Sequence, residues 1–323
     1  MASVFAPSPA PTEHKASTIC EMAAGAPAAS IQLFDIEGPA GNSGNSPCNF
    51  AYLETMRLID IGVNFHSKQL RGLTDGLIDR AKAADVVAIL ATGTSLQSSH
   101  DQLGLAHRYP GYLFSTAGVH PHSADAWSAE MLSALGALWQ DDVCVAVGEC
   151  GLDYNRNFST PANQRLAFAA QLSAAVKTRK PLFLHCRDAF SDFYAMTKEA
   201  VQAGAHGVVH CFTESADEAQ AFVDIGLDIG ITGWVTDEKR GSALRSALPD
   251  LPLDRLHLET DAPYLGPKNA KKRRPYNEPA NLIWVARAVA ELKGISEEVV
   301  AEACTENSRR LFGLSLSPPV AQS

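Results

Sequence analysis

Eight short apolar runs, separated by longer amphipathic segments, restrict the fold of this chain more than any other feature of its sequence. The runs are rich in Val, Ile and Leu, as are strands of a parallel sheet that is covered on both faces. Eight strand–helix units within about 260 residues match a (β/α)8 TIM barrel, which is the predicted fold. A doubly wound open sheet is the alternative, but no Gly-x-Gly-x-x-Gly follows the first run to favour it. The runs cover residues 57–64, 86–94, 113–121, 143–151, 181–187, 207–212, 227–235 and 255–265.

The segments between the runs carry helix signals. The clearest start is "NFSTPANQ", where Thr160 can cap the helix and Pro161 takes a position at which its missing N–H costs nothing. The predicted helices include Ser123–Trp139, Pro161–Thr178, Ser191–Ala203 and Ser215–Asp224.

Residues 1–55 differ in composition from the remainder. They are rich in Ala, Pro, Ser, Gly and Asn, which predicts a flexible, low-complexity extension. They resemble neither a secretory signal nor a mitochondrial transit peptide, and a start site at Met56 is consistent with this boundary. The predicted organisation is an extension over 1–55, a barrel domain over 56–314 and a C-terminal tail over 315–323.

Charge and cysteine content indicate the compartment and the partners. The net charge of −9 gives no overall basic field, so attraction to nucleic acid must be local or carried by a metal. The seven cysteines include no Cys-x-x-Cys pair, which is typical of reduced thiols in the cytoplasm. No apolar run is long enough to cross a bilayer. We expect a cytoplasmic protein without a membrane partner.

Side chains that bind metals or move protons stand at the ends of several runs. In a parallel barrel these ends meet at one mouth, where active sites are built. Burying carboxylates and imidazoles together costs several kcal/mol unless a cation compensates them. The pattern therefore predicts a shared metal site. The third run ends at His120-Pro121-His122, the fourth at Glu149, the fifth at His185, the sixth at His210, and the eighth at Glu259 and Asp261.

A cysteine directly follows three of these residues, at Cys150, Cys186 and Cys211. Thiolates are good zinc ligands, but successive strand residues point to opposite faces. If the preceding residues face the mouth, the cysteines face the helices. We therefore predict that they are small core residues.

Eight motifs resemble those of the TatD family of metal-dependent deoxyribonucleases, in order from about Met56 to Gly313. The resemblance implies a TIM barrel of the metallo-dependent hydrolase type. It also implies phosphodiester hydrolysis with Mg²⁺, as a 3′→5′ exonuclease on single-stranded DNA and also on RNA, with a part in DNA repair or in degrading fragmented DNA. The motifs are "DIGVN", "STAGVHPH", "VGECGLDYNRNFSTP", "FLHCRDA", "HCFT", "IGITGWV", "ETDAPYL" and "NEPANL".

The resemblance also implies roles for individual residues. Glu149, His185 and His210 correspond to metal ligands, which gives Glu149 a catalytic part. Asp261 corresponds to a carboxylate that contacts the metal or its bound water, and would orient or deprotonate that water. His120 corresponds to a histidine near the scissile phosphate. Arg187 is a candidate phosphate contact.

The first run departs from the pattern of many relatives, in which Asp-x-His-x-His holds a second metal. Aligned at Asp60, the two histidines are Gly62 and Asn64 here. Asn64 offers only a neutral amide and is expected to contact substrate, while His66 is a possible substitute ligand. This departure indicates one well-held metal and favours the exonuclease branch of the family. Two imidazoles suit Mn²⁺ or Zn²⁺ better than Mg²⁺, so Mn²⁺ and Zn²⁺ remain alternatives to Mg²⁺.

The run "KNAKKRRPYNEP" follows the eighth strand and is either a solvated loop or a phosphate-tracking segment through Lys271, Lys272, Arg273 and Arg274. The expected partners are 3′ ends of single-stranded DNA or RNA, and the expected state is a monomer. Two other functions stay open. One is a small-molecule amidohydrolase or lactonase, which usually needs the missing His-x-His pair. The other is a non-catalytic barrel that binds nucleic acid.

Overall fold

The computed structural model describes residues 56–271 and 274–316. The predicted extension over 1–55, residues 317–323 of the predicted tail, and Lys272 and Arg273 lie outside the described residues. Among the described helices, none has the length and apolarity that crossing a membrane requires.

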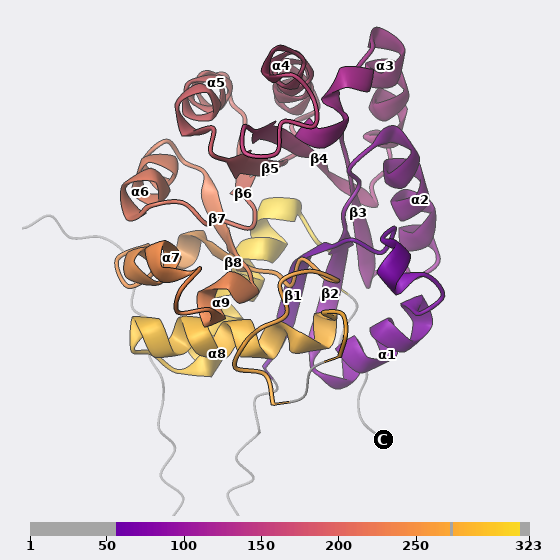
Figure 1. Cartoon of the computed structure of the whole chain (residues 1–323). Coiled ribbons are helices and arrows are strands. Elements are labelled where there is room, and N and C mark those ends of the chain that lie inside the picture. The colour runs from indigo at the N-terminus through magenta and orange to yellow at the C-terminus, as the bar shows by residue number, and fades with distance from the viewer. Residues whose placement is uncertain (1–55, 272–273, 317–323) are drawn as a thin grey trace, which may run out of the picture. The chain divides into compact units, whose positions relative to one another are not determined.

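Eight parallel strands follow one another around the sheet in chain order, which confirms the predicted TIM barrel (Figure 1). A bridge between Val63 and Ala262 joins the first and last strand segments. The carboxyl ends of the strands therefore meet at one mouth, as the sequence predicted. The strands are β1 (Leu58–Val63), β2 (Val86–Ala91), β3 (Leu113–Ala117), β4 (Cys144–Asp153), β5 (Leu182–Arg187), β6 (Gly207–Val209), β7 (Asp228–Ile231) and β8 (Leu256–Leu258).

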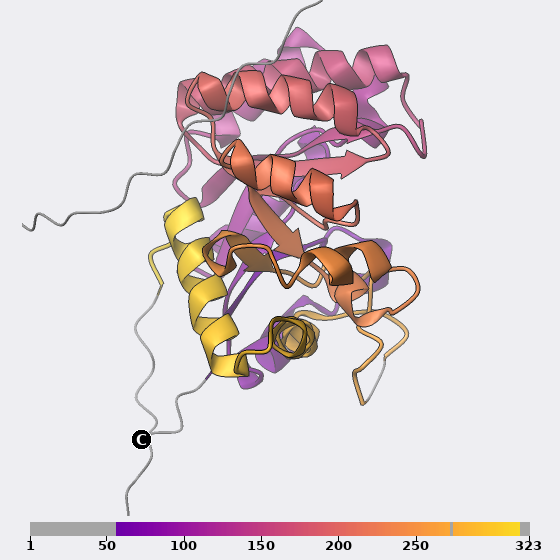
Figure 2. The ribbon, with the colours of Figure 1, turned by 90° about the vertical axis from the view of Figure 1, so that its left-hand side faces the viewer.

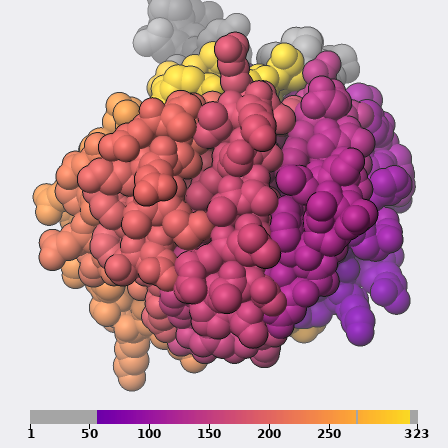
Figure 3. Space-filling model, turned by 90° about the horizontal axis from the view of Figure 1, so that it is seen from above, coloured from indigo at the N-terminus to yellow at the C-terminus, as the bar shows by residue number. Residues whose placement is uncertain are grey.

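Helices surround the barrel in the same order, so that neighbours in sequence are neighbours in space (Figure 1). Seen from above, successive parts of the chain lie side by side across the outer surface (Figure 3). The last helix lies across the amino-terminal end of the strands (Figure 2). The helices are α1 (Thr74–Ala83), α2 (Leu96–His107), α3 (Ala129–Leu138), α4 (Pro161–Thr178), α5 (Phe190–Gln202), α6 (Ala216–Asp224), α7 (Ser242–Ala247), α8 (Leu282–Lys293) and α9 (Glu297–Phe312).

The apolar core has two layers, as expected when both faces of the sheet are covered. The larger layer lies between the strands and the helices. The smaller layer fills the barrel interior, where Phe312 and Leu314 at the end of α9 pack against residues such as Ile59, Leu90 and Phe183. Because α9 closes the amino-terminal end, the opposite mouth is left for the site.

The helix signals are confirmed where a cap was present. Helix α4 begins at Pro161, and Thr160 accepts a hydrogen bond from the Asn163 N–H at 3.3 Å. The predicted helix from Ser123 was wrong in its first part, because residues 121–126 form a 3-10 turn and Ser128 caps α3.

Candidate metal centre

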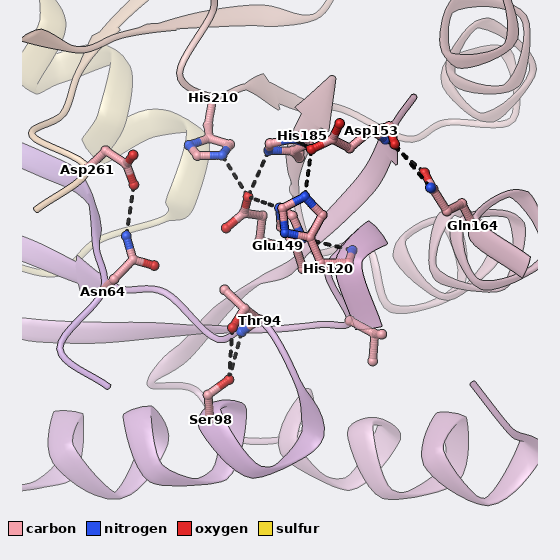
Figure 4. A network of polar contacts seen from close by, with 12 residues as sticks. Asn64, Thr94, Ser98, His120, Glu149, Asp153, Gln164, His185, His210 and Asp261 are labelled. Atoms are coloured by element: carbon pink, nitrogen blue, oxygen red, sulfur yellow. Dashed lines mark hydrogen bonds and ion pairs between the residues drawn. The ribbon is translucent and has the colours of Figure 1, made fainter. Parts of the chain in front are cut away.

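A cavity of about 570 Å³ opens at the mouth of the barrel, and all seven predicted site residues outside the basic run line it. Figure 4 shows six of them, with Glu149 at the centre of a network of polar contacts. The seven are Asn64, His120, Glu149, His185, Arg187, His210 and Asp261.

Three imidazoles converge on one oxygen of Glu149. Glu149 Oε1 lies 3.1 Å from His120 Nε2, 3.0 Å from His185 Nδ1 and 2.9 Å from His210 Nε2. Glu149 lies on β4 and His185 on the adjacent β5, while His120 and His210 follow the ends of β3 and β6. Gly151 permits the close approach of β4 and β5, since a Cβ at this positive-φ position would collide with the His185 carbonyl. Four strand ends therefore bring the predicted cluster together.

The charges of the cluster favour a cation at its centre. Burial alone would raise the pKa of Glu149, but His210 and His120 hold it well below its usual range. Burial would lower the pKa of His210, but Glu149 and Glu259 raise it well above its usual value. The protein thus stabilises positive charge next to Glu149. A metal ion placed there would take over this role and displace the protons.

The second nitrogen of each imidazole has a different partner. His210 Nδ1 lies 3.3 Å from Glu259 Oε2, and His185 Nε2 lies 3.6 Å from Asp153 Oδ2. Glu259 keeps a proton on Nδ1 of His210, so the His210 nitrogen that faces Glu149 can offer a lone pair to a metal, whereas within the described part of the chain His185 Nε2 has no hydrogen-bond partner at its longer distance.

His120 has the opposite arrangement. Its Nδ1 accepts the backbone N–H of His122 at 3.1 Å, and burial lowers the pKa of His120 to about 4. The ring is therefore neutral, and its proton is on Nε2, which faces the site. Among the described residues, the donor atoms of His120, Glu149 and His185 lie within 4.8 Å of one another, a spacing that could hold a metal ion, while the contact at Nδ1 leaves His120 a proton to donate from Nε2.

Glu259, which the sequence placed at the end of the eighth strand without a role, is fully buried behind His210. Its Oε1 accepts the backbone N–H of Cys211 at 2.5 Å. A Cβ at Gly62 would lie 2.5 Å from Oε2, and a Cβ at Gly230 would lie 2.7 Å from Oε1. The glycine that replaces the first histidine of the two-metal motif therefore provides the space for this carboxylate.

Asp261 and Asn64 form a second part of the site. Asn64 Nδ2 donates to Asp261 Oδ1 at 2.8 Å. Burial raises the pKa of Asp261 to about 7, although His210 opposes the shift. Asp261 is thus a carboxylate that can exchange a proton near neutral pH.

The cysteine prediction is confirmed at two positions and wrong at the third. Cys150 and Cys186 pack in the layer between strands and helices, but Cys211 lines the cavity. Strand β6 ends at Val209, and Cys211 has a φ of 48°, so the alternation of a strand no longer applies there. Burial and Asp261 raise the pKa of the Cys211 thiol well above its usual value, which disfavours a thiolate ligand.

Other predicted residues lie outside the cluster. His66 lines the cavity, where its Nε2 lies 3.3 Å from Thr94 Oγ1. In the described part of the basic run, Lys271 is exposed and Arg274 Nε pairs with Glu278 Oε1 at 3.1 Å. Neither Lys271 nor Arg274 is among the described residues that line the cavity.

Sequence reasoning assigned no role to Asp153 or Phe158, and named His122 without assigning one. All three line the cavity, and His122 Nε2 lies 2.6 Å from Asp153 Oδ2. The alternation of side chains along β4 predicts that Asp153 lies on the same face as Glu149, because residues 149, 151 and 153 share one face of the strand. The sequence carried no signal for the exposed position of Phe158.

Known proteins resemble this chain over most of its length. Residues 59–313 match the family model described as TatD related DNase. A 3′-5′ ssDNA/RNA exonuclease TatD from Erwinia billingiae is 47% identical over 80% of this chain and 99% of that protein. Among solved structures, YJJV, a TatD homologue from Escherichia coli K12, has a TM-score of 0.74 at 28% identity, covering 81% of this chain and all of the other. A hydrolase TatD family protein from Entamoeba histolytica has a TM-score of 0.72 at 27% identity, covering 80% and 99%.

Proposed function

Because the chain belongs to the TatD related DNase family, we propose that it is a metal-dependent 3′→5′ exonuclease that hydrolyses phosphodiester bonds of single-stranded DNA and RNA. The observation that carries the proposal is the convergence of His185 and His210 on Glu149 Oε1, beside Asp261, at the mouth of the barrel. A family relative named for this activity aligns over nearly its whole length.

The donor set fits one divalent cation, held by Glu149, His185 and His210. His185 Nδ1 and His210 Nε2 lie 3.0 and 2.9 Å from one oxygen of Glu149, and a carboxylate oxygen lies 3.6 Å from the second nitrogen of His185 and 3.3 Å from that of His210. A divalent cation there supplies charge neutralisation for the phosphodiester and lowers the pKa of a bound water. We propose Mg²⁺ as the physiological ion, with Mn²⁺ also supporting activity because imidazole nitrogen suits it better.

The remaining groups divide the work around the phosphate. Asp261, oriented by Asn64, accepts a proton from the attacking water. His120 donates its Nε2 proton as a hydrogen bond to a phosphate oxygen, where negative charge develops. Arg187 and Arg156, which line the same cavity, provide positive charge for the strand.

We propose that the protein acts as a monomer in the cytoplasm. One chain supplies every residue assigned above, and the five cysteines within the described residues are free thiols.

Digestion of a 5′-labelled single-stranded oligonucleotide tests the proposal. A ladder that shortens from the 3′ end is expected with Mg²⁺ or Mn²⁺ and not with EDTA, and a 3′-terminal phosphorothioate linkage should slow it. Glu149→Gln should remove the activity. Glu130→Gln, which changes an exposed carboxylate on α3, should keep it. Digestion that persists in EDTA or in Glu149→Gln would refute the metal-dependent mechanism.

A further inference from the structure

Two exposed aromatic side chains stand in the cavity, and the mechanism above uses neither. The large hydrophobic side chains that are exposed among the described residues are Leu73, Phe158, Leu166, Tyr264 and Val299. The two aromatic ones, Phe158 and Tyr264, are 64% and 48% exposed, and both line the cavity. Leaving large aromatic surface in water is unfavourable. Its concentration at this cavity therefore indicates a ligand that covers it.

The two rings stand on opposite sides of the mouth. Phe158 belongs to the loop after β4, and Tyr264 belongs to the loop after β8. Because the strands follow one another in order around the barrel, β4 and β8 are half a turn apart. Glu149 and Asp261 come from the same two strand ends. A phosphodiester held between these carboxylates has one aromatic ring on either side.

The loop that carries Phe158 is held in place by hydrogen bonds. Asp153 Oδ1 accepts the backbone N–H of Arg156 at 2.8 Å, and Gln164 Nε2 donates to the Asp153 carbonyl at 3.1 Å. The Phe158 ring packs edge-on against His122, with ring centroids 4.8 Å apart. The ring is therefore positioned before a ligand arrives, which lowers the entropic cost of binding.

The chemistry of the cavity matches a nucleic acid strand with unpaired bases. Arg156 and Arg187 supply cations for phosphates, and the rings offer flat surfaces for bases. Stacking on a ring uses the face that every base has, so it tolerates any sequence. An internal base pair of a duplex is covered on both faces by its neighbours, so two rings cannot each stack on one of two successive paired bases without unstacking them.

We propose that Phe158 and Tyr264 each stack one of the two bases that flank the scissile phosphate. This pair of rings then selects a single-stranded end and leaves the sequence free. The inference rests on the proposed nuclease function and adds the substrate contact that determines single-strand selectivity.

Steady-state kinetics on two single strands test the inference in the full-length protein. One strand is intact, and the other carries abasic tetrahydrofuran residues at its last two positions. Phe158→Ala and Tyr264→Ala should each raise KM for the intact strand roughly 5- to 100-fold, with little change in kcat. On the abasic strand, these variants should match the wild type. Phe158→Tyr and Tyr264→Phe should restore the wild-type KM. Leu166→Ala, which removes an exposed side chain of α4 outside the cavity, should change nothing.

The possible failures are distinguishable. If the wild type digests the intact strand and both alanine variants keep its KM, the stacking inference is wrong and the proposed function stands. Equal losses on the intact and abasic strands also overturn stacking, because the rings would then contact something other than bases. A wild type that digests neither strand with Mg²⁺, Mn²⁺ or Zn²⁺ refutes the proposed function, and the inference falls with it.

Discussion

At the scale of the residue, three imidazoles that look alike in the sequence have different partners at their second nitrogens. All three lie within 3.1 Å of Glu149 Oε1. His210 and His185 have carboxylates near their second nitrogens, whereas His120 accepts a backbone N–H there. We propose that the group on the far side of each ring determines whether the near nitrogen binds a cation or donates a proton.

We expect His120→Asn to lower kcat and His210→Asn to lower the affinity for Mn²⁺. His120→Asn should lower kcat about 10²- to 10³-fold, as the loss of one donor to a developing negative charge does, and should leave Mn²⁺ affinity nearly unchanged. His210→Asn should weaken Mn²⁺ binding by more than about 100-fold, because it removes a ligand. Isothermal titration with Mn²⁺ measures both affinities. An equal loss of Mn²⁺ affinity in the two variants would make His120 a ligand as well.

Glu259 should act on the metal through His210. Glu259→Gln is expected to weaken Mn²⁺ binding about 10- to 100-fold, since a neutral amide holds the His210 proton less strongly. Gly62→Ala should have the same effect, because its methyl group would lie 2.5 Å from Glu259 Oε2 and displace the carboxylate. Gly104→Ala, where a Cβ meets nothing within 4 Å, is the control. Normal Mn²⁺ affinity in Gly62→Ala would show that Glu259 has no positioning role.

The site residues that the sequence predicts differ from the others in how their positions are determined. Glu149, His185 and His210 each continue the strand pattern, so their position at the mouth followed from counting. The contacts of His122 and Glu259 join segments distant in the sequence, such as His122 with Asp153 and Glu259 with His210. Spacing along one strand carries no information about those contacts. The exposure of Phe158 depends on the shape of a loop, which the apolar pattern does not record.

At the scale of the element, the seam between β1 and β8 depends on Asp60, the residue at which the two-histidine motif of many relatives aligns. Asp60 Oδ1 accepts the backbone N–H of Thr260 at 2.9 Å, and Oδ2 accepts the Thr260 hydroxyl at 2.6 Å. The Asn64 N–H donates to the Ala262 carbonyl at 2.7 Å further along. Asp60 therefore joins the first and last strands. The repeated strand–helix pattern predicted that a barrel must close, but not which side chain closes it.

This seam should make stability depend on pH. Burial raises the pKa of Asp60 to about 8, against the opposing effect of the Thr260 hydrogen bonds. Between about pH 4 and pH 8 the folded protein holds a proton that the unfolded chain releases, so stability falls as pH rises, by at most about 1.4 kcal/mol per pH unit. Asp60→Asn lacks this dependence. Urea denaturation of both proteins in EDTA measures the free energy of unfolding. The difference between the wild type and Asp60→Asn should become smaller from pH 5 to pH 8. A constant difference would contradict the shift.

At the scale of the whole molecule, the first described residues are part of the packed domain. Met56 packs against the core, and the Arg57 carbonyl accepts a hydrogen bond from the Thr305 hydroxyl at 2.7 Å. We propose that residues 56–314 form the complete catalytic domain. A protein that starts at Met56 should have the thermal midpoint and the kcat/KM of the full chain within about twofold, by thermal melting and exonuclease assay. A large loss of either would assign a structural or substrate-binding role to residues 1–55.

The net charge of −9 bears on how the molecule attracts a polyanion. An acidic protein gains little from long-range steering of nucleic acid, so binding must depend on the few cations at the mouth. Arg156 and Arg187 line the cavity, whereas Arg274 of the basic run pairs with Glu278. The site and the basic run therefore predict different responses to salt.

The dependence of activity on salt concentration should show whether the strand is bound by the arginines of the cavity or by the basic run over residues 271–274. For single strands, log affinity falls with log salt by about 0.7 for each phosphate that a protein cation contacts. Contacts from Arg156 and Arg187 alone give a slope of about −1.4, and four further contacts from residues 271–274 would give about −4. We expect the shallow slope when kcat/KM is measured against KCl concentration at fixed Mg²⁺. Replacing Lys271, Lys272 and Arg273 with Gln should leave it unchanged, whereas Arg187→Gln should reduce it by about 0.7. A slope of about −4 that these three changes reduce to about −2 would instead make the basic run the track for the strand.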